Sequence, residues 1–336
     1  MKNKILLYLV LFPVVPLTLL NNCKKEAVAP TVTLAPVTNI TSNSATSGGY
    51  ITTEGTSAVT ARGVCLATTQ NPTTANSKTA DGTGTGTFIS NLKGLFPGTS
   101  YYLRAYATNS AGTSYGDEIP FKTLAITYGT MSDNDGNVYR TITIGTQVWM
   151  VENLKTTKYR NGESIPNVTV NTSWKALTTG AYCWYNNDAT IYKADYGALY
   201  NWYAVADGRN IAPMGWHVPT YSDWTLLKDY LGGRSVAGGP LKETGDSHWQ
   251  TPNRYATNST GFTALPGGRR NFDQNFFVGL GSYGYWWSST IACPPTGACP
   301  PTWAWSCLSI SSGDNDVGLN DAYNRKDGLS VRCVRD

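Results

Sequence analysis

Apolar and polar residues alternate over short stretches in the first part of the chain. Residues 61–67 (ARGVCLA) and 100–107 (SYYLRAYA) show the alternation that is typical of half-buried strands. Gly, Pro and Asn turns separate such stretches between residues 31 and 124. Short strands with turns at this spacing predict a small all-β sandwich of the immunoglobulin-like kind.

A second region of alternation predicts a β-hairpin. Residues 133–137 (DNDGN) form a polar turn, and alternation continues from there to Ile144. Gly145 and Thr146 then reverse the chain into residues 147–150 (QVWM), which is a hairpin pattern. The acids around Gly136 match a calcium loop only in part, because the later ligands of an EF-hand are missing, so a plain turn is favoured.

Helical periodicity appears within residues 214–233. Thr220 is placed as an N-cap, and Asp223 stands at the N3 position of a capping box. The pattern predicts a helix from Tyr221 to Leu231 that ends at Gly232-Gly233. Its apolar face contains three side chains, those of Trp224, Leu227 and Leu231.

Composition divides the chain into two domains. All eleven tryptophans lie after residue 126, and residues 31–124 contain none. Of the 26 basic residues, two lie near the N-terminus at Lys2 and Lys4, so 24 basic residues balance 22 acidic ones in the remainder. This balance gives no electrostatic reason to expect nucleic acid or an anionic membrane surface as a partner.

The first 22 residues are typical of a signal peptide. Lys2 and Lys4 precede an apolar run from Ile5 to Leu20 that is too short for a membrane span. The run ends at Leu20-Asn21-Asn22-Cys23, which resembles a bacterial lipobox, although Asn22 replaces the usual small residue. The resemblance implies that Cys23 is lipidated and that residues 23–30 tether the protein to outer-membrane lipid. Secretion with a free Cys23 is the alternative.

The sequence LKGLFPGTSYYLRAYATNSAGTSYG resembles fibronectin type III domains around their tyrosine corner. The resemblance covers residues 31–124 and implies that Tyr101 or Tyr102 ties its phenol to a loop carbonyl. This domain has no His and one Cys. We therefore predict that it is a spacer, with ligand binding by its loops as the alternative.

Six motifs in the second domain occur together and in order: GNVYRTITIGTQVWMVENLKT, GALYNWYAV, GWHVPTYSDWTLL, GFTALPGG, YWWSST and GLSVRCVRD. They resemble the Fibrobacter succinogenes major paralogous domain, which is found in lipoproteins and secreted proteins of Bacteroidota and Fibrobacterota. The resemblance covers residues 126–336 and implies an α+β fold related to C-type-lectin-like and sulfatase-modifying-factor domains, but no particular activity.

Six cysteines remain beyond Cys23, in a compartment where disulfides persist. The Pro- and Gly-rich loop from Cys293 to Cys299 suits a local disulfide, and Cys183 with Cys333 is the predicted long-range pair. Pairing of Cys307 with Cys333 stays open. Cys65 is expected as a small buried residue of the first domain.

Residues that could carry enzyme chemistry are few. His217 and His248 are the only histidines, too few for a zinc or copper site, so both are expected to be packed or hydrogen-bonded. Formylglycine-generating oxidases use a close cysteine pair that binds copper. Cys293, Cys299 or Cys307 would have to fill that role, and their flanking residues do not match. We therefore predict that the protein is not an enzyme and has no cofactor.

Aromatic residues crowd into one window of the second domain. In a lectin-like fold such residues stack on sugar rings or anchor protein partners, and packing in the core is the alternative. Calcium is a weaker candidate ligand of nearby oxygen-bearing residues, because the lectin calcium motifs are absent. The aromatic candidates are Tyr283, Tyr285, Trp286, Trp287, Trp303 and Trp305, and the calcium candidates are Asp314, Asp316, Asn320 and Asp321.

Together these patterns predict a lipid-anchored cell-envelope protein with an adhesion or recognition function. A fibronectin type III-like spacer would hold a lectin-like domain away from the outer membrane, exposed at the cell surface or in the periplasm. The ligand would be a glycan or a surface protein. A structural envelope component without a discrete ligand is the first alternative, and an oxidase related to the formylglycine-generating enzymes is the second.

Overall fold

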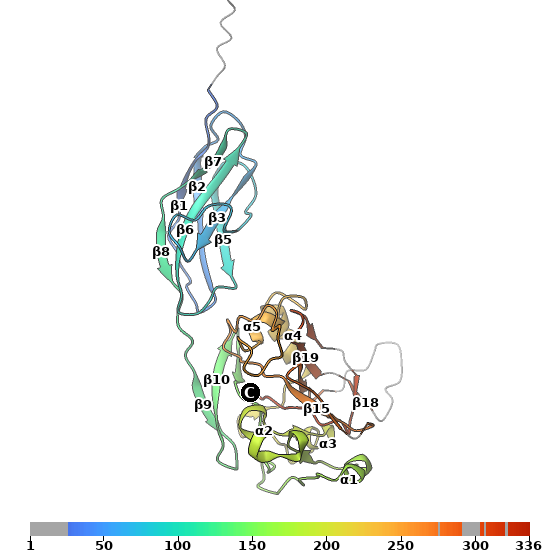
Figure 1. Cartoon of the computed structure of the whole chain (residues 1–336). Coiled ribbons are helices and arrows are strands. Elements are labelled where there is room, and N and C mark those ends of the chain that lie inside the picture. Colours follow the sequence, from blue (N-terminus) through green and yellow to red (C-terminus); the bar gives the residue numbers. More distant parts are fainter. Residues whose placement is uncertain (1–25, 275, 291–302, 306, 320–321) are drawn as a thin grey trace, which may run out of the picture.

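The computed structural model describes residues 26–274, 276–290, 303–305, 307–319 and 322–336. The chain forms two domains that lie end to end (Figure 1). Residues 123–128 connect the last strand of the first domain to the first strand of the second. Within the described residues, no helix has both the length and the apolar composition needed to cross a bilayer.

The first domain is an antiparallel sandwich of two sheets, as the sequence predicts. One sheet has the order β1-β2-β5, and the other has the order β4-β3-β6-β7 with β8 also paired to β6. Their inner faces bury Val64, Phe88 and Leu103. Strand β3 has the predicted bounds, and β6 extends two residues beyond the predicted Ala107. The strands are β1 (Thr31–Leu34), β2 (Ser44–Thr53), β3 (Ala61–Ala67), β4 (Ser77–Lys78), β5 (Gly86–Lys93), β6 (Ser100–Asn109), β7 (Gly112–Tyr115) and β8 (Ile119–Lys122).

Tyr101 forms the corner that makes this sandwich fibronectin type III-like. Its ring is buried and stacks on Phe121, with 5.6 Å between the ring centroids. Its hydroxyl oxygen accepts a hydrogen bond of 2.9 Å from the backbone N–H of Phe96. The predicted partner was a carbonyl, so the corner uses the phenol as an acceptor instead. Tyr102 points to the other face of β6 and is half-buried.

Replacing Tyr101 by phenylalanine is expected to destabilise the first domain by about 1 kcal/mol, because the N–H of Phe96 loses its acceptor. Hydrogen exchange of the β6 amides, followed by mass spectrometry, should then be about fivefold faster. Tyr102→Phe is the matched control, since no hydrogen bond to its hydroxyl is seen in the described part of the chain. Equal exchange in the two variants would contradict the assigned corner.

The second domain is built on a five-stranded antiparallel sheet with the order β14-β22-β11-β10-β9. The predicted hairpin is confirmed as β10 and β11, and Gly145 at its turn has a φ of 61°. The C-terminal strand β22 lies between β11 and β14, so both ends of the domain belong to one sheet. The strands are β9 (Gly129–Ser132), β10 (Val138–Ile144), β11 (Gln147–Met150), β14 (Trp216–His217) and β22 (Val334–Arg335).

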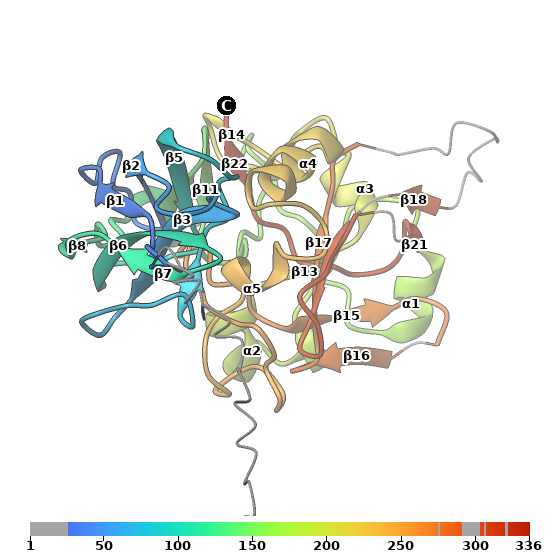
Figure 2. The same cartoon turned by 90° about the horizontal axis from the view of Figure 1, so that it is seen from above.

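The rest of the second domain consists of short helices and small sheets. Figure 2 shows α1, α2 and α4 toward its outside, with β13 and β17 nearer its centre. The helices are α1 (Asn171–Ala176), η1 (Tyr185–Asn187), α2 (Ala189–Tyr196), α3 (Trp202–Val205), α4 (Tyr221–Tyr230) and α5 (Gly238–Leu241). The strand groups are β12 (Tyr182–Cys183) with β13 (Leu199–Tyr200), β15 (Gly267–Asn271) with β16 (Phe276–Leu280), β17 (Tyr283–Trp287) with β19 (Cys307–Ser311) and β20 (Val317–Gly318), and β18 (Trp303–Trp305) with β21 (Ala322–Asn324).

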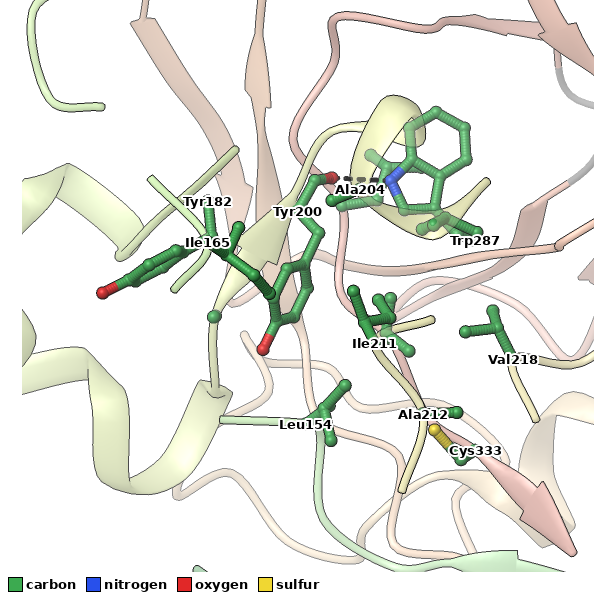
Figure 3. Packing of buried hydrophobic residues seen from close by; sticks show 14 of the residues in the cluster. Leu154, Ile165, Tyr182, Tyr200, Ala204, Ile211, Ala212, Val218, Trp287 and Cys333 are labelled. Carbon is green, nitrogen blue, oxygen red and sulfur yellow. Dashed lines mark hydrogen bonds between the residues drawn. The ribbon is translucent and has the colours of Figure 1, made fainter. Parts of the chain in front are cut away.

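Aromatic rings form most of the core of this domain. Trp287 and Tyr200 lie in one cluster, where the indole N–H of Trp287 donates a 2.7 Å hydrogen bond to the carbonyl of Tyr200 (Figure 3). Trp149 and Trp224 stack in a second cluster, with 4.6 Å between their centroids. Large rings bury much apolar area per residue, which suits a domain with little regular structure. Six tryptophans have no more than 1% of their surface exposed: Trp149, Trp174, Trp224, Trp249, Trp286 and Trp287.

Three buried cations also belong to the core: Lys242, Arg270 and Arg332. Among the described residues, none of them forms an ion pair with a carboxylate at contact distance. Each donates hydrogen bonds to backbone carbonyls, and each lies over an aromatic ring. Because an unpaired buried charge is costly, carbonyl dipoles and ring faces must supply the stabilisation that a carboxylate would give. The rings are those of Trp249, Trp174 and Phe262 respectively.

The long-range disulfide predicted between Cys183 and Cys333 is wrong. Both are free, fully buried thiols, and they belong to separate apolar clusters. Burial raises the pKa of Cys183 to about 11 and that of Cys333 well above its ordinary range. Cys65 is buried in the first domain, as expected. Cys293 and Cys299 lie outside the described residues, as does the side chain of Cys307.

Candidate functional site

An open groove of about 550 Å³ lies on one face of the β17-β19-β20 sheet. The small residues Ser309 and Gly318 form its floor. Ser309 pairs with Tyr285 of β17 on one side and with Gly318 of β20 on the other. Tyrosines from β17 and β21 line one wall, and charged residues from two loops line the other. The lining residues are Arg234, Tyr283, Tyr285, Ser309, Ile310, Ser311, Asp314, Asp316, Gly318 and Tyr323.

The tyrosine wall is a row of packed rings. Tyr283 and Tyr285 are nearly parallel, at 14°, with 5.7 Å between their centroids, and the centroid of Tyr323 is 5.5 Å from that of Tyr285. The guanidinium of Arg269 lies 5.0 Å from the centroid of Tyr323 and is bound to Asp327 at 3.3 Å. These contacts fix the rings before any ligand arrives, so binding loses little side-chain entropy. Tyr283, at the outer end, is 44% exposed.

The opposite wall carries Asp314 and Asp316. A carboxylate oxygen of Asp314 accepts a hydrogen bond of 3.1 Å from the N–H of Asp316, which folds the turn. The carboxylate of Asp316 lies 3.7 Å from the guanidinium of Arg234. The wall therefore combines hydrogen-bond acceptors with one compensating cation.

Lys242 lies beneath this wall and holds it. Its ammonium donates to the carbonyls of Ser311, at 3.0 Å, and Asp314, at 2.8 Å. Burial lowers the pKa of Lys242 to about 8, against the opposing effect of the Asp314 charge. The N–H of Gly238, in α5, donates to the carbonyl of Asn315 at 2.9 Å. A Cβ at Gly238 would lie 2.7 Å from that carbonyl oxygen, so this close approach requires glycine.

The groove brings together residues from two separate predictions. Tyr283 and Tyr285 were aromatic candidates, Asp314 and Asp316 were calcium candidates, and all four line the same groove. Asn320 and Asp321 lie outside the described residues, as do the side chains of Trp303 and Trp305. Within the described ranges, no three His, Cys, Asp or Glu side chains gather in a cluster that could hold a metal.

Trp286 and Trp287 cannot serve as ligand-stacking residues, which corrects the sequence prediction. Neither side chain is exposed, and both indole N–H groups are used internally, by Asn153 and by Tyr200. Alternation along β17 does place them on opposite faces. Both faces are covered at that end of the strand, because Trp286 enters one core cluster and Trp287 the other.

Sequence reasoning did not select Arg234, Lys242 or Tyr323 as site residues. Each comes from a segment that only folding places beside β17, and no local pattern marks the contact. Lys242 had one weak signal: it follows Gly238-Gly239-Pro240-Leu241, and two adjacent glycines often mark a close backbone approach.

His217 is held by two carboxylates and has a structural role. Its Nδ1 lies 2.8 Å from Asp336 and its Nε2 lies 3.1 Å from Asp223. Asp223 also completes the predicted capping box of α4 with Thr220. These two partners were not evident from the sequence. The contacts of His217 with Asp336 and Asp223 join the C-terminus to the start of α4. The other histidine, His248, is bound to Glu243 at 2.8 Å.

Replacing Asp223 by alanine is expected to lower the free energy of unfolding by about 1–2 kcal/mol at pH 7. Burial alone would raise the pKa of this carboxyl, but hydrogen bonds from Thr220 and His217 outweigh burial and hold it below its ordinary value. The lowered pKa contributes stability above the ordinary pKa, and this stability is lost as the pH falls through the folded-state pKa. Urea unfolding should therefore show a difference between variant and wild type that shrinks below about pH 4.

Asp229 is the control for this prediction, because it lies at the other end of α4 with 58% of its side chain exposed. Asp229→Ala should change stability by less than about 0.5 kcal/mol at either pH. A difference between Asp223→Ala and wild type that does not vary with pH would contradict the assigned role.

Several solved structures with likeness to this chain match about 30% of it. The sensor domain of the anti-sigma factor RsgI4 in Pseudobacteroides cellulosolvens is 19% identical, with 30% of this chain and 99% of that chain covered and a TM-score of 0.23. The fibronectin type III domain of human fibronectin type III domain containing protein 3 is 15% identical, with 30% and 93% covered and a TM-score of 0.23. That of the human KIAA0970 protein is 12% identical, with 28% and 73% covered and a TM-score of 0.22.

No curated protein sequence matches this chain. A family model matches residues 142–335, which is more than half of the chain and includes the whole groove. The chain belongs to the family described as the Fibrobacter succinogenes major domain.

Proposed function

We propose that this protein is a lipid-anchored module of the cell envelope that binds a glycan in the tyrosine-lined groove and catalyses no reaction. The observation that carries the proposal is the pre-packed row of Tyr283, Tyr285 and Tyr323 above a floor of serine and glycine. Aromatic rings pack against the apolar C–H surfaces of sugars. The carboxylates of Asp314 and Asp316 on the opposite wall supply hydrogen-bond acceptors for sugar hydroxyls.

The arrangement of the two domains supports the role of the first as a spacer. The start of the described chain and residues 124–128 lie at opposite ends of the first domain (Figure 1). A lipid on Cys23 would thus be separated from the groove by the length of the sandwich. Cys23→Ala should release the protein from the membrane fraction, and retention of the variant there would contradict lipidation at this residue.

A C-type-lectin-like character of the second domain is part of the proposal. Pairing of its first strands with its last strand in one sheet supports it, as does a site formed by irregular segments in its C-terminal half. Display at the cell surface is also proposed. Protease treatment of intact cells should degrade the protein, whereas protection until the outer membrane is opened would place it in the periplasm.

The binding proposal is tested with the full-length protein, purified in detergent and applied to a glycan array. Wild-type protein should bind at least one glycan class, and Tyr283→Ala should weaken that binding at least tenfold, since a well-placed aromatic contact contributes more than about 1.4 kcal/mol. Tyr50→Ala is the matched control, because Tyr50 is 50% exposed but lies in the first domain.

Two outcomes would contradict the proposal: no glycan bound by the wild type, or equal binding by Tyr283→Ala. The first would favour a structural envelope component. Trp303→Ala and Trp305→Ala belong in the same experiment, because they test the remaining aromatic candidates. A loss confined to these two variants would move the site away from the groove.

A further inference from the structure

The buried ammonium of Lys242 binds the turn that forms the acidic wall of the groove. Its Nζ donates to three carbonyl oxygens, those of Arg254 at 2.6 Å, Ser311 at 3.0 Å and Asp314 at 2.8 Å. Two of these three carbonyls belong to residues that line the groove. The positive charge is therefore fixed directly beneath the acidic wall, where solvent cannot screen it fully.

The charged residues that line the groove and Lys242 beneath them sum to zero at neutral pH. Arg234 and Asp316 form one pair, at 3.7 Å. Lys242 and Asp314 interact as a second pair, since the Asp314 charge favours the protonated lysine. Behind the tyrosine wall, Arg269 is paired with Asp327 at 3.3 Å. Although the carboxylates of Asp314 and Asp316 line the groove, it exerts no net attraction on a cation or an anion.

We propose, resting on the proposed glycan function, that the groove selects uncharged glycans and that Lys242 is a specificity-determining residue. It cancels the charge of Asp314 and positions the turn that carries it. An acidic glycan meets two carboxylates at the wall, and a basic glycan meets the opposing fields of Arg234 and Lys242. A neutral polyhydroxylated glycan can donate hydrogen bonds from its hydroxyl groups to the carboxylates. It has no counter-ions that must be released when it binds.

The turn is held by more than Lys242, which makes surface variants informative. The N–H of Gly238 binds the carbonyl of Asn315, and the N–H of Val317 binds the carbonyl of Arg234. Asp314 itself is exposed, and its side chain makes one hydrogen bond within the turn. Asp314→Asn keeps that acceptor and changes the net charge of the groove from zero to plus one.

The experiment measures dissociation constants for three probes, a neutral glucan, a polygalacturonate and a glucosamine oligomer, in 20 mM and 500 mM NaCl. With wild-type protein, the neutral probe should bind tightest, with less than a twofold change between the two salt concentrations. Asp314→Asn should gain about fivefold for polygalacturonate at low salt only, as expected for one exposed charge. Lys242→Gln should shift the preference toward the glucosamine oligomer. If Lys242→Gln does not fold, Asp314→Asn alone tests the inference.

The outcomes separate this inference from the function on which it rests. Tighter binding of either charged probe by the wild type, or no gain for polygalacturonate in Asp314→Asn at low salt, would overturn charge selection and leave glycan binding intact. Failure of all three probes, together with a glycan array on which the wild type binds nothing, would instead contradict the proposed function, and the inference with it.

Discussion

Trp287→Ala is expected to lower the free energy of unfolding of the second domain by about 3–5 kcal/mol. The Trp287 side chain is fully buried within the cluster that contains Tyr200, Leu329 and Val331. Truncation removes its apolar contacts and leaves a cavity that the packed rings around it cannot fill. It also removes the 2.7 Å hydrogen bond to the carbonyl of Tyr200.

Urea unfolding followed by tryptophan fluorescence measures this effect in the second domain alone. All eleven tryptophans lie after residue 126, so the first domain does not contribute to the signal. Tyr283→Ala is the matched control from the same strand and should change stability by less than about 1 kcal/mol. If the variant does not fold, Trp287→Phe should still show a loss of about 1–3 kcal/mol. Wild-type stability in Trp287→Ala would mean that this residue is not a core residue.

Arg332→Met is expected to destabilise the same domain by about 3 kcal/mol. The guanidinium donates to the carbonyls of Phe262 and Thr263 and to the side-chain oxygen of Asn153. Each buried acceptor that loses its donor costs about 1–3 kcal/mol, although Asn153 keeps a bond from Trp286. Removing a buried charge recovers part of this loss, since burial already lowers the pKa of Arg332 to about 9.

Two further variants show whether the hydrogen bonds or the charge carry the effect. Arg332→Lys keeps the positive charge, but an ammonium lacks the planar guanidinium that binds several acceptors at once. Most of the loss of stability predicted for Arg332→Met should therefore persist in Arg332→Lys. Arg335→Met changes an exposed arginine three residues away and should stay within about 0.5 kcal/mol of wild type. Full stability in Arg332→Lys would show that charge, and not the fork, is what the core requires.

The burial of Arg332 could not be predicted from the sequence pattern around it. An arginine between apolar residues in GLSVRCVRD has the appearance of a solvent-facing position on a strand. Its burial depends on Phe262 and Trp286, which lie 70 and 46 positions away and supply the rings that cover the guanidinium. Likewise, the carbonyls that replace a carboxylate partner come from a loop that has no sequence signature.

The sequence by itself determined the local elements and the family. Strand β3, the β10–β11 hairpin and helix α4 with its capping box follow from residue alternation, turn glycines and an N-cap, all of which act over a few neighbouring residues. The six motifs likewise identified the family that the match over residues 142–335 establishes.

Only the tertiary structure decided which aromatic residues are available to a ligand. Alternation placed Trp286 and Trp287 on opposite faces of β17, and it could not reveal that a core cluster covers each face. The groove itself depends on the register of β17 with β19, which pairs Tyr285 with Ser309, 24 positions away, and on the pairing of Ser309 with Gly318 in β20. The free state of Cys183 and Cys333 has the same origin, since burial in separate clusters keeps the two thiols apart.

The proposed function depends on a rigid row of tyrosine rings that is already in place to pack against a sugar. The charge of the acidic wall opposite is balanced by the lysine beneath it. A wild-type protein that ignores every carbohydrate presented to it would contradict that function. Long-range packing decides this point, because the rings, the acids and the lysine are neighbours only in the folded chain.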